Sequence, residues 1–441
     1  MLYGIAAATA ALFLAAVLAA LLRVPALRLG LIDRRQRQRR VPLSGGAAVV
    51  LATCAVAVVG DRTGVAPLGD GVGVLLVAGG AVAALGLVAD VCRLKTRFLA
   101  VGTAVAAAFV VPYGETYGEM GGMHGDAWTV VGVVSAAMGV GWITFVALAF
   151  RALDHAEGVA GTVGVLTAFG VAACVAVEVM DGLVVLLSVL AAALTGFLMH
   201  NWPPARVALG ACGSLFAGFL LAAAAVFARA GHDPLVGTGV LFALTAVGAA
   251  DVLLVTVSRR LAGRPLLRGA PDHLAHRLRR LGLTAQGAAV LLGLAAFGAV
   301  LVGVLVHAGV VEVRAVSWVV GGALVVALGL SRVQVYGPPR ARGRLYGQPG
   351  GPPGGPPRAR GRRLGGPDRR ARRAPEAQAS REAQASRDVR EAREAREARR
   401  APVYAPRRQS EGGAHHPESG ERRPGRAVST QVNGSLRVRN G

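Results

Sequence analysis

Three aspartates are candidates for chemistry because each lies in or beside a long apolar segment. Asp90 follows the letters GLVA, Asp154 follows FRAL, and Asp251 lies within GAADVLLV. An ionised carboxylate is costly at membrane depth and is a functional candidate there. Carboxylate oxygens are also the ligands that Mg²⁺ or Mn²⁺ prefers. If the three aspartates meet at one end of their helices, they form a plausible site for a metal and a phosphate.

Other polar side chains lie at the same predicted ends of the helices. Glu157 follows Asp154 by three residues, and His273, His276 and Arg277 share a basic loop. Each has an ordinary structural explanation as well. Asp154 and Glu157 could be acids favoured by the dipole at a helix N-terminus, Asp90 could pair with Arg93 at the surface, and the histidines could belong to a solvated loop.

The elements that position these residues are apolar helices. Apolar residues make up 53% of the chain and the mean hydropathy is +0.50. Runs of about twenty apolar residues can cross a bilayer, where a helix satisfies its own backbone. The sequence predicts an all-α, polytopic membrane domain over residues 1–332. About eleven transmembrane helices are expected, near 2–22, 44–60, 71–89, 98–112, 128–150, 159–178, 182–200, 210–231, 235–257, 284–308 and 317–332.

Loop charge predicts the orientation of these helices. One alternating set of loops carries nineteen basic residues and the other carries three. Because basic loops stay in the cytoplasm, this indicates an N-terminus outside and a cytoplasmic C-terminus in the plasma membrane. No positive region precedes the first apolar run, so we expect a retained helix rather than a signal peptide.

Residues 333–441 form a second region, with no apolar cluster. They are rich in Gly, Pro and Arg and contain REA repeats near 381–400. This composition predicts a disordered cytoplasmic tail, a solvated linker or a segment that contacts anionic lipid. Aromatic residues are not interleaved with the arginines, so nucleic acid is not an expected partner.

Five segments, in order and on one predicted side, resemble the polyprenyl-phosphate N-acetylhexosamine-1-phosphate transferases. This family, glycosyltransferase family 4, includes the N-acetylglucosamine-1-phosphate and phospho-N-acetylmuramoyl-pentapeptide types. The segments are LGLIDRRQRQRRVPLSGG, GLVADVCRLKTR, FRALDHAEGVAG, NWPPARVALGACGSLFAGF and APDHLAHRLRRLG. They cover roughly residues 25–330, and the eleven spans fit the N-acetylglucosamine-1-phosphate branch better.

The resemblance implies a reaction and a set of roles. UDP-N-acetylhexosamine and polyprenyl phosphate would give a polyprenyl-diphospho-sugar and UMP, for a cell-envelope polysaccharide. A divalent cation, Mg²⁺ or Mn²⁺, would offset charge on the diphosphate. Catalytic roles fall on Asp90, Asp154 and Asp251, with Asp90 and Asp154 as metal ligands. Substrate-binding roles fall on Glu157, Asn201, Arg206, His273, His276 and Arg277.

The departures from the family pattern fall on the same chemistry. Ala89 and Ala211 replace aspartates expected at the metal site, Arg151 replaces an asparagine, and Ala275 replaces a histidine. Fewer carboxylates mean weaker binding of a hard cation. Three interpretations stay open: an active transferase with an altered metal site, an inactive family member that binds lipid phosphate or a partner enzyme, and an unrelated membrane scaffold or transporter. The sugar, the prenyl length and the oligomeric state are not indicated.

Overall fold

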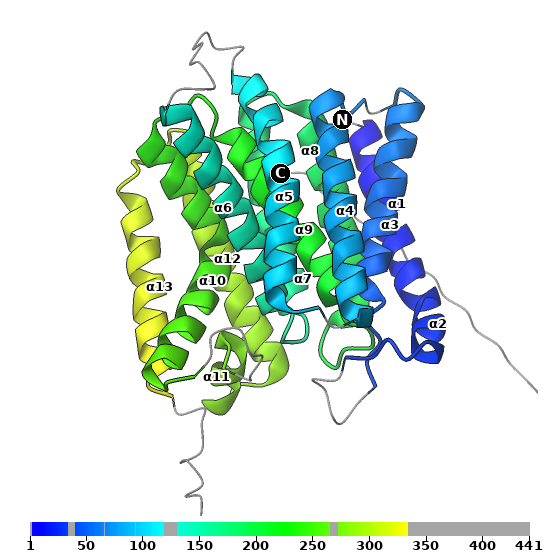
Figure 1. The fold of residues 1–441 in the computed structure, drawn as a ribbon, viewed down its shortest axis with the longest axis vertical. Coiled ribbons are helices and arrows are strands. Elements are labelled where there is room, and N and C mark those ends of the chain that lie inside the picture. The colour runs from blue at the N-terminus through cyan, green and yellow to red at the C-terminus, as the bar shows by residue number, and fades with distance from the viewer. Residues whose placement is uncertain are drawn as a thin grey trace, which may run out of the picture. The chain divides into compact units, whose positions relative to one another are not determined.

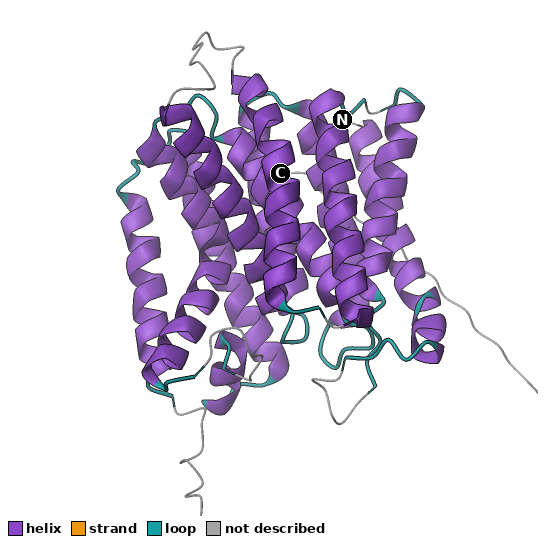
Figure 2. Cartoon of the chain, in the orientation of Figure 1, coloured by secondary structure: helices purple, strands orange, loops and turns teal. Residues whose placement is uncertain are grey.

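Thirteen helices make up the regular structure of the described part of the chain, and no strand occurs there. A computed structural model describes residues 2–33, 40–65, 67–92, 94–118, 130–264 and 272–333. Helices run side by side along one direction in this region (Figures 1 and 2). They are α1 (Leu2–Leu21), α2 (Arg23–Arg28), α3 (Gly45–Arg62), α4 (Asp70–Cys92), α5 (Thr96–Gly118), α6 (Val130–Leu153), α7 (Val159–Val177), α8 (Asp181–Asn201), α9 (Gly210–Ala228), α10 (Pro234–Leu261), α11 (Leu274–Arg280), α12 (Ala285–His307) and α13 (Ala315–Ser331).

Ten helices in the described residues are long and apolar enough to cross a membrane. The prediction of a polytopic all-α fold is therefore confirmed. The eleventh predicted span corresponds to α13, an apolar helix of 17 residues that is shorter than the other ten. The short helices α2 and α11 lie at the same end of the bundle (Figure 1). Which end faces the cytoplasm stays a prediction from loop charge.

Helix α9 is the centre of the bundle, and all of its residues are buried. It packs against α3, α4, α5, α6 and α7. Close approach depends on glycine, because a Cβ atom at position 46 on α3 would collide with the backbone nitrogen of Gly213 on α9. Small residues let helix backbones approach in this way within membranes. The N-terminus of α9 is thereby fixed beside the ends of α4 and α6.

Residues 1–345 and 346–441 are separate units. Residues 334–441 of the predicted tail, including its REA repeats, lie outside the described residues.

Candidate functional site

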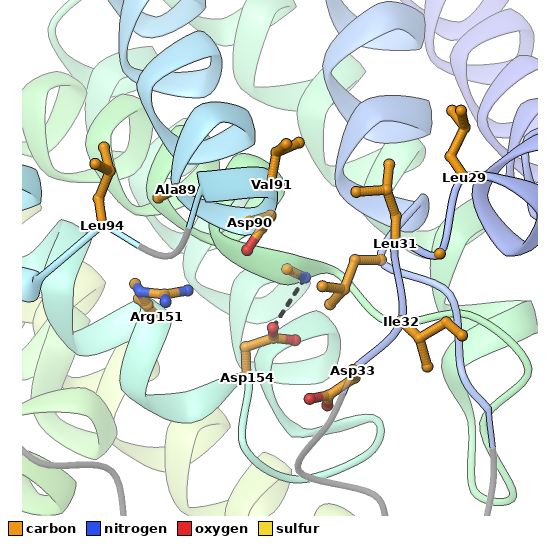
Figure 3. A pocket seen from close by; sticks show the side chains of 13 residues that line it. Leu29, Leu31, Ile32, Asp33, Ala89, Asp90, Val91, Leu94, Arg151 and Asp154 are labelled. Atoms are coloured by element: carbon orange, nitrogen blue, oxygen red, sulfur yellow. Dashed lines mark hydrogen bonds between the residues drawn. The ribbon is translucent and has the colours of Figure 1, made fainter.

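A cavity of about 500 Å³ lies where α4, α6 and α9 meet the segment after α2. Asp33, Asp90, Arg151 and Asp154 form its polar wall (Figure 3). Its other wall is mostly apolar, with Leu29, Leu31, Ile32, Leu43, Val91 and Leu94. The cavity therefore offers a charged side and an apolar side to one ligand.

Asp90 binds the first amides of α9. It lies in the last turn of α4, and its two carboxylate oxygens accept hydrogen bonds from the amides of Ala211 at 3.0 Å and Cys212 at 3.2 Å. Gly210 permits this contact: it has φ of +72°, and a side chain there would lie 2.6 Å from Oδ2 of Asp90. The free amides at a helix N-terminus attract anions. Here the protein's own carboxylate is that anion.

Asp154 approaches the same helix end from α6. Its Oδ2 accepts a hydrogen bond from the amide of Gly210 at 2.9 Å, drawn as the dashed line in Figure 3. The guanidinium of Arg151, one turn earlier, points to the side of the cavity where Asp90 and Asp154 lie (Figure 3). The described lining holds three carboxylates and one guanidinium, a formal net charge of −2.

Glu157 and Asn201 join two loops beside the cavity. Oε2 of Glu157 accepts the amide of Ala205 at 2.9 Å. The buried Asn201 accepts the amide of Gly158 and donates to the carbonyl of Val207, both at 2.8 Å. These contacts hold the loop after α6 against the loop before α9. The side chains of Glu157 and Asn201 therefore fix the backbone of these two loops. The role of each in substrate binding stays a prediction.

Asp251 and His273 form a second polar group. Asp251 is 1% exposed; its Oδ2 lies 2.8 Å from Nδ1 of His273, and its Oδ1 accepts the amide of Leu274 at 2.7 Å. The ring of His155, next to Asp154 in sequence, stacks on His273 with centroids 4.1 Å apart. His155 thus connects the second group to the first. The predicted convergence of helix ends is therefore seen as two adjacent clusters.

The remaining predicted residues lie in different surroundings. His276 is half-buried in α11, and burial together with the nearby His273 and Arg279 lowers the pKa of its imidazole. Arg277 is 1% exposed and donates to the carbonyls of Leu330 at 2.6 Å and Val333 at 3.0 Å, at the end of α13. Arg206 is exposed in the loop before α9.

Asp33 is a cavity residue that the sequence analysis did not select. It lies in the LGLIDRR segment, and its amide donates to the carbonyl of Val41 at 2.8 Å. An isolated antiparallel bridge pairs Ile32 with Pro42 next to this residue. The aspartate of the first loop motif was the signal that could have identified it.

Comparison with known proteins decides the family. The model of glycosyl transferase family 4 matches residues 72–229. A putative glycosyltransferase of Streptomyces coelicolor is 64% identical, over 77% of this chain and 80% of the relative. The chain belongs to glycosyl transferase family 4.

More distant relatives carry activities in their names. The decaprenyl-phosphate N-acetylglucosaminephosphotransferase of Mycolicibacterium smegmatis is 28% identical, over 63% of this chain and 76% of the relative. A probable undecaprenyl-phosphate N-acetylglucosaminyl 1-phosphate transferase of Bacillus subtilis is 26% identical, over 32% of this chain and 40% of the relative. This family consists of membrane transferases that join sugar phosphates to polyprenyl phosphates.

The cavity residues fit the divalent cation implied by the family only in part. Asp33, Asp90 and Asp154 supply carboxylates to the cavity, and Ala89 in its lining supplies only a methyl group. Ala211, next to the lining residue Gly210 at the start of α9, is fully buried and also carries only a methyl group. Both carboxylate oxygens of Asp90 already accept amides. Because affinity for a hard cation depends on ligand charge and number, this donor set is expected to hold such a cation weakly.

Proposed function

We propose that this chain is a family 4 membrane protein that binds polyprenyl phosphate in the aspartate cavity but transfers sugar phosphate far more slowly than its relatives. It would then act as a lipid-phosphate binding protein in cell-envelope polysaccharide synthesis. The observation that carries this proposal is the start of α9. Position 211 presents only a methyl group there, and its backbone amide is bonded to Asp90.

Charge supports the loss of transfer. Relative to the family pattern, two carboxylates are missing and Arg151 adds a positive charge, a shift of about three units toward positive. A metal ion supplies several kcal/mol of stabilisation to charge that develops during phosphoryl transfer, and each 1.36 kcal/mol corresponds to about tenfold in rate. A poorly held metal is therefore expected to lower the transfer rate by about a hundredfold or more.

The lining of the cavity supports lipid-phosphate binding. Its apolar wall, with Leu29, Leu31 and Val91, suits the first isoprene units of a polyprenyl chain. Arg151 on the polar wall can hold a phosphate, since a guanidinium matches phosphate oxygens in pairs. The apolar tail of such a ligand matches the apolar wall, and its phosphate head would pair with Arg151.

The proposal is tested with the purified full chain, using the Mycolicibacterium smegmatis relative as a positive control. UMP release is measured with UDP-N-acetylglucosamine, decaprenyl phosphate and Mg²⁺ or Mn²⁺. Decaprenyl phosphate binding is measured separately by native mass spectrometry. We expect UMP release about a hundredfold or more below that of the relative, together with saturable lipid binding that Arg151→Asn weakens at least about tenfold.

Two outcomes would overturn the proposal. UMP release at the relative's rate, abolished by Asp154→Asn, would establish an active transferase. Absence of saturable lipid binding to a monodisperse protein would remove the binding role. A double variant, Ala89→Asp with Ala211→Asp, tests whether the missing carboxylates are the cause of the slow transfer. It should raise UMP release if only the metal ligands are missing.

One observation favours a second candidate, an active transferase with an altered metal site. Asp33, Asp90 and Asp154 still line one cavity, and its net charge of −2 would balance one divalent cation. Under this alternative, UMP release depends on Asp33 as well as on Asp154.

A further inference from the structure

Glu178, His232 and His307 meet at the end of the bundle opposite the aspartate cavity. Glu178 follows α7, His232 lies between α9 and α10, and His307 is the last residue of α12. Helix α9 starts at the cavity and ends four residues before His232. Its 19 residues span roughly 28 Å at 1.5 Å per residue. The cluster is therefore separate from the site described above.

The three side chains bring their ligand atoms close together. Oε1 of Glu178 lies 3.0 Å from Nε2 of His307 and 3.5 Å from Nε2 of His232. The two imidazole rings stack, with centroids 4.7 Å apart and an interplanar angle of 24°. One ligand atom from each residue falls within 4.8 Å of the others. Ligands of a tetrahedral Zn²⁺ at about 2.0–2.1 Å lie about 3.3 Å from one another, close to the two measured separations.

His307 is held as a metal ligand usually is. It is 6% exposed, and its Nε2 lies 3.0 Å from Oε1 of Glu178. A backbone hydrogen bond to Cys174 fixes its ring. Histidines that bind metals commonly have the ring fixed by a backbone or carboxylate partner in this manner. A buried imidazole nitrogen beside a carboxylate oxygen offers two donor atoms that one cation can share.

We propose that Glu178, His232 and His307 bind a divalent transition-metal ion of the Zn²⁺ class. Two imidazole nitrogens and one carboxylate oxygen suit Zn²⁺, whereas Mg²⁺ and Ca²⁺ prefer oxygen ligands alone. Three protein ligands leave a position for water. A cavity of about 340 Å³, lined in part by Ser135, Arg229 and His232, gives the ion a route of entry. The bound ion links the end of α7, the segment after α9 and the end of α12, and so stabilises that end of the bundle.

The test uses the full chain without a histidine tag and with His415→Ala and His416→Ala, which remove the paired histidines near the C-terminus. After treatment with a chelator, Zn²⁺ binding is measured by titration calorimetry, metal content by mass spectrometry and thermal unfolding with and without Zn²⁺. We expect one Zn²⁺ per chain and a higher unfolding temperature with metal. X-ray absorption of the loaded protein should show two imidazoles and light-atom ligands.

Single variants then test the ligands. Glu178→Gln and His232→Asn should each lower Zn²⁺ affinity at least about tenfold and remove the metal-dependent rise in unfolding temperature. His200→Asn, at the other end of the bundle, is the control and should leave both unchanged. His232 is half-buried, whereas His307 is buried. The His232 variant is therefore expected to fold even if a variant of His307 does not, and it tests the site in that case. Zn²⁺ affinity that survives both ligand variants, or no saturable binding up to about millimolar Zn²⁺, would overturn the proposal.

Discussion

Asp90 on α4 and Ala211 on α9 are joined by a 3.0 Å hydrogen bond from the Ala211 amide to the Asp90 carboxylate. The resemblance of the sequence to the family implies an aspartate at position 211. Here its side chain is a fully buried methyl group. Asp90 therefore closes the N-terminus of the central helix. A residue that the sequence marks for chemistry also supports the fold, and this dual role gives the first prediction.

Asp90→Ala is expected to destabilise the membrane domain. It leaves the amides of Ala211 and Cys212 without their acceptor at a helix N-terminus, where loss of a cap or of a buried acceptor costs about 1–3 kcal/mol. Asp90→Asn keeps an oxygen acceptor and should cost less. Unfolding in detergent measures both. Glu312→Ala, at a side chain that is 79% exposed, is the control, and an equal effect there would contradict the interpretation.

Asn201→Ala is expected to loosen the two loops beside the cavity. The change removes the acceptor for Gly158 and the donor for Val207. Because two buried polar groups lose their partners, we expect a loss of at least about 2 kcal/mol in the free energy of unfolding. SDS titration measures this. Ser188→Ala, which removes only a bond to its own helix at Val184, should change stability by less than about 0.5 kcal/mol.

Arg277→Lys is expected to destabilise the end of α13. The guanidinium of Arg277 reaches carbonyls of Leu330, Ser331 and Val333 as well as the hydroxyl of Ser258. An ammonium group cannot present the same planar set of donors. Loss of charged hydrogen bonds costs about 1.5–3 kcal/mol each. The matched control is Arg279→Lys on the exposed face of α11. If Arg277→Lys unfolds like the control but weakens substrate binding, Arg277 serves the substrate instead.

Acidification is expected to weaken the protein through His276. Burial, His273 and Arg279 lower the pKa of this imidazole, against the opposing effect of Asp251 and Asp272. In the unfolded chain its pKa is about 6.5. Below about pH 6.5, His276 is protonated in the unfolded chain more readily than in the folded chain. Stability is therefore complete above about pH 6.5 and falls as the pH drops toward the lower folded pKa.

The measurement for this prediction is the unfolding temperature as a function of pH. His276→Gln should flatten the acid side of the profile, whereas His415→Gln should leave it unchanged. A profile that keeps its acid slope in His276→Gln would assign the slope to other groups.

The helices of this protein were predictable because a bilayer leaves the chain little choice. Runs of about twenty apolar residues must form helices there, and α1, α7, α8 and α12 follow the predicted ranges closely. The motif order likewise indicated the family, and Ala89 and Ala211 were visible as departures from it. Asp33 was also within reach, since it is part of the first motif.

Only the tertiary structure decided which polar groups meet. Asp90 and Ala211 lie 121 residues apart in the chain, and the local sequence does not indicate that they are in contact. It also does not indicate that Asp251 and His273 form a cluster of their own beside the aspartate cavity. Arg277, a predicted substrate residue, donates to carbonyls at the end of α13, and its role in substrate binding stays a prediction. Glu178, His232 and His307 belong to no motif and meet because three helices end at one level. Such juxtapositions depend on how helices pack, and the apolar pattern that predicts a helix does not specify its neighbours.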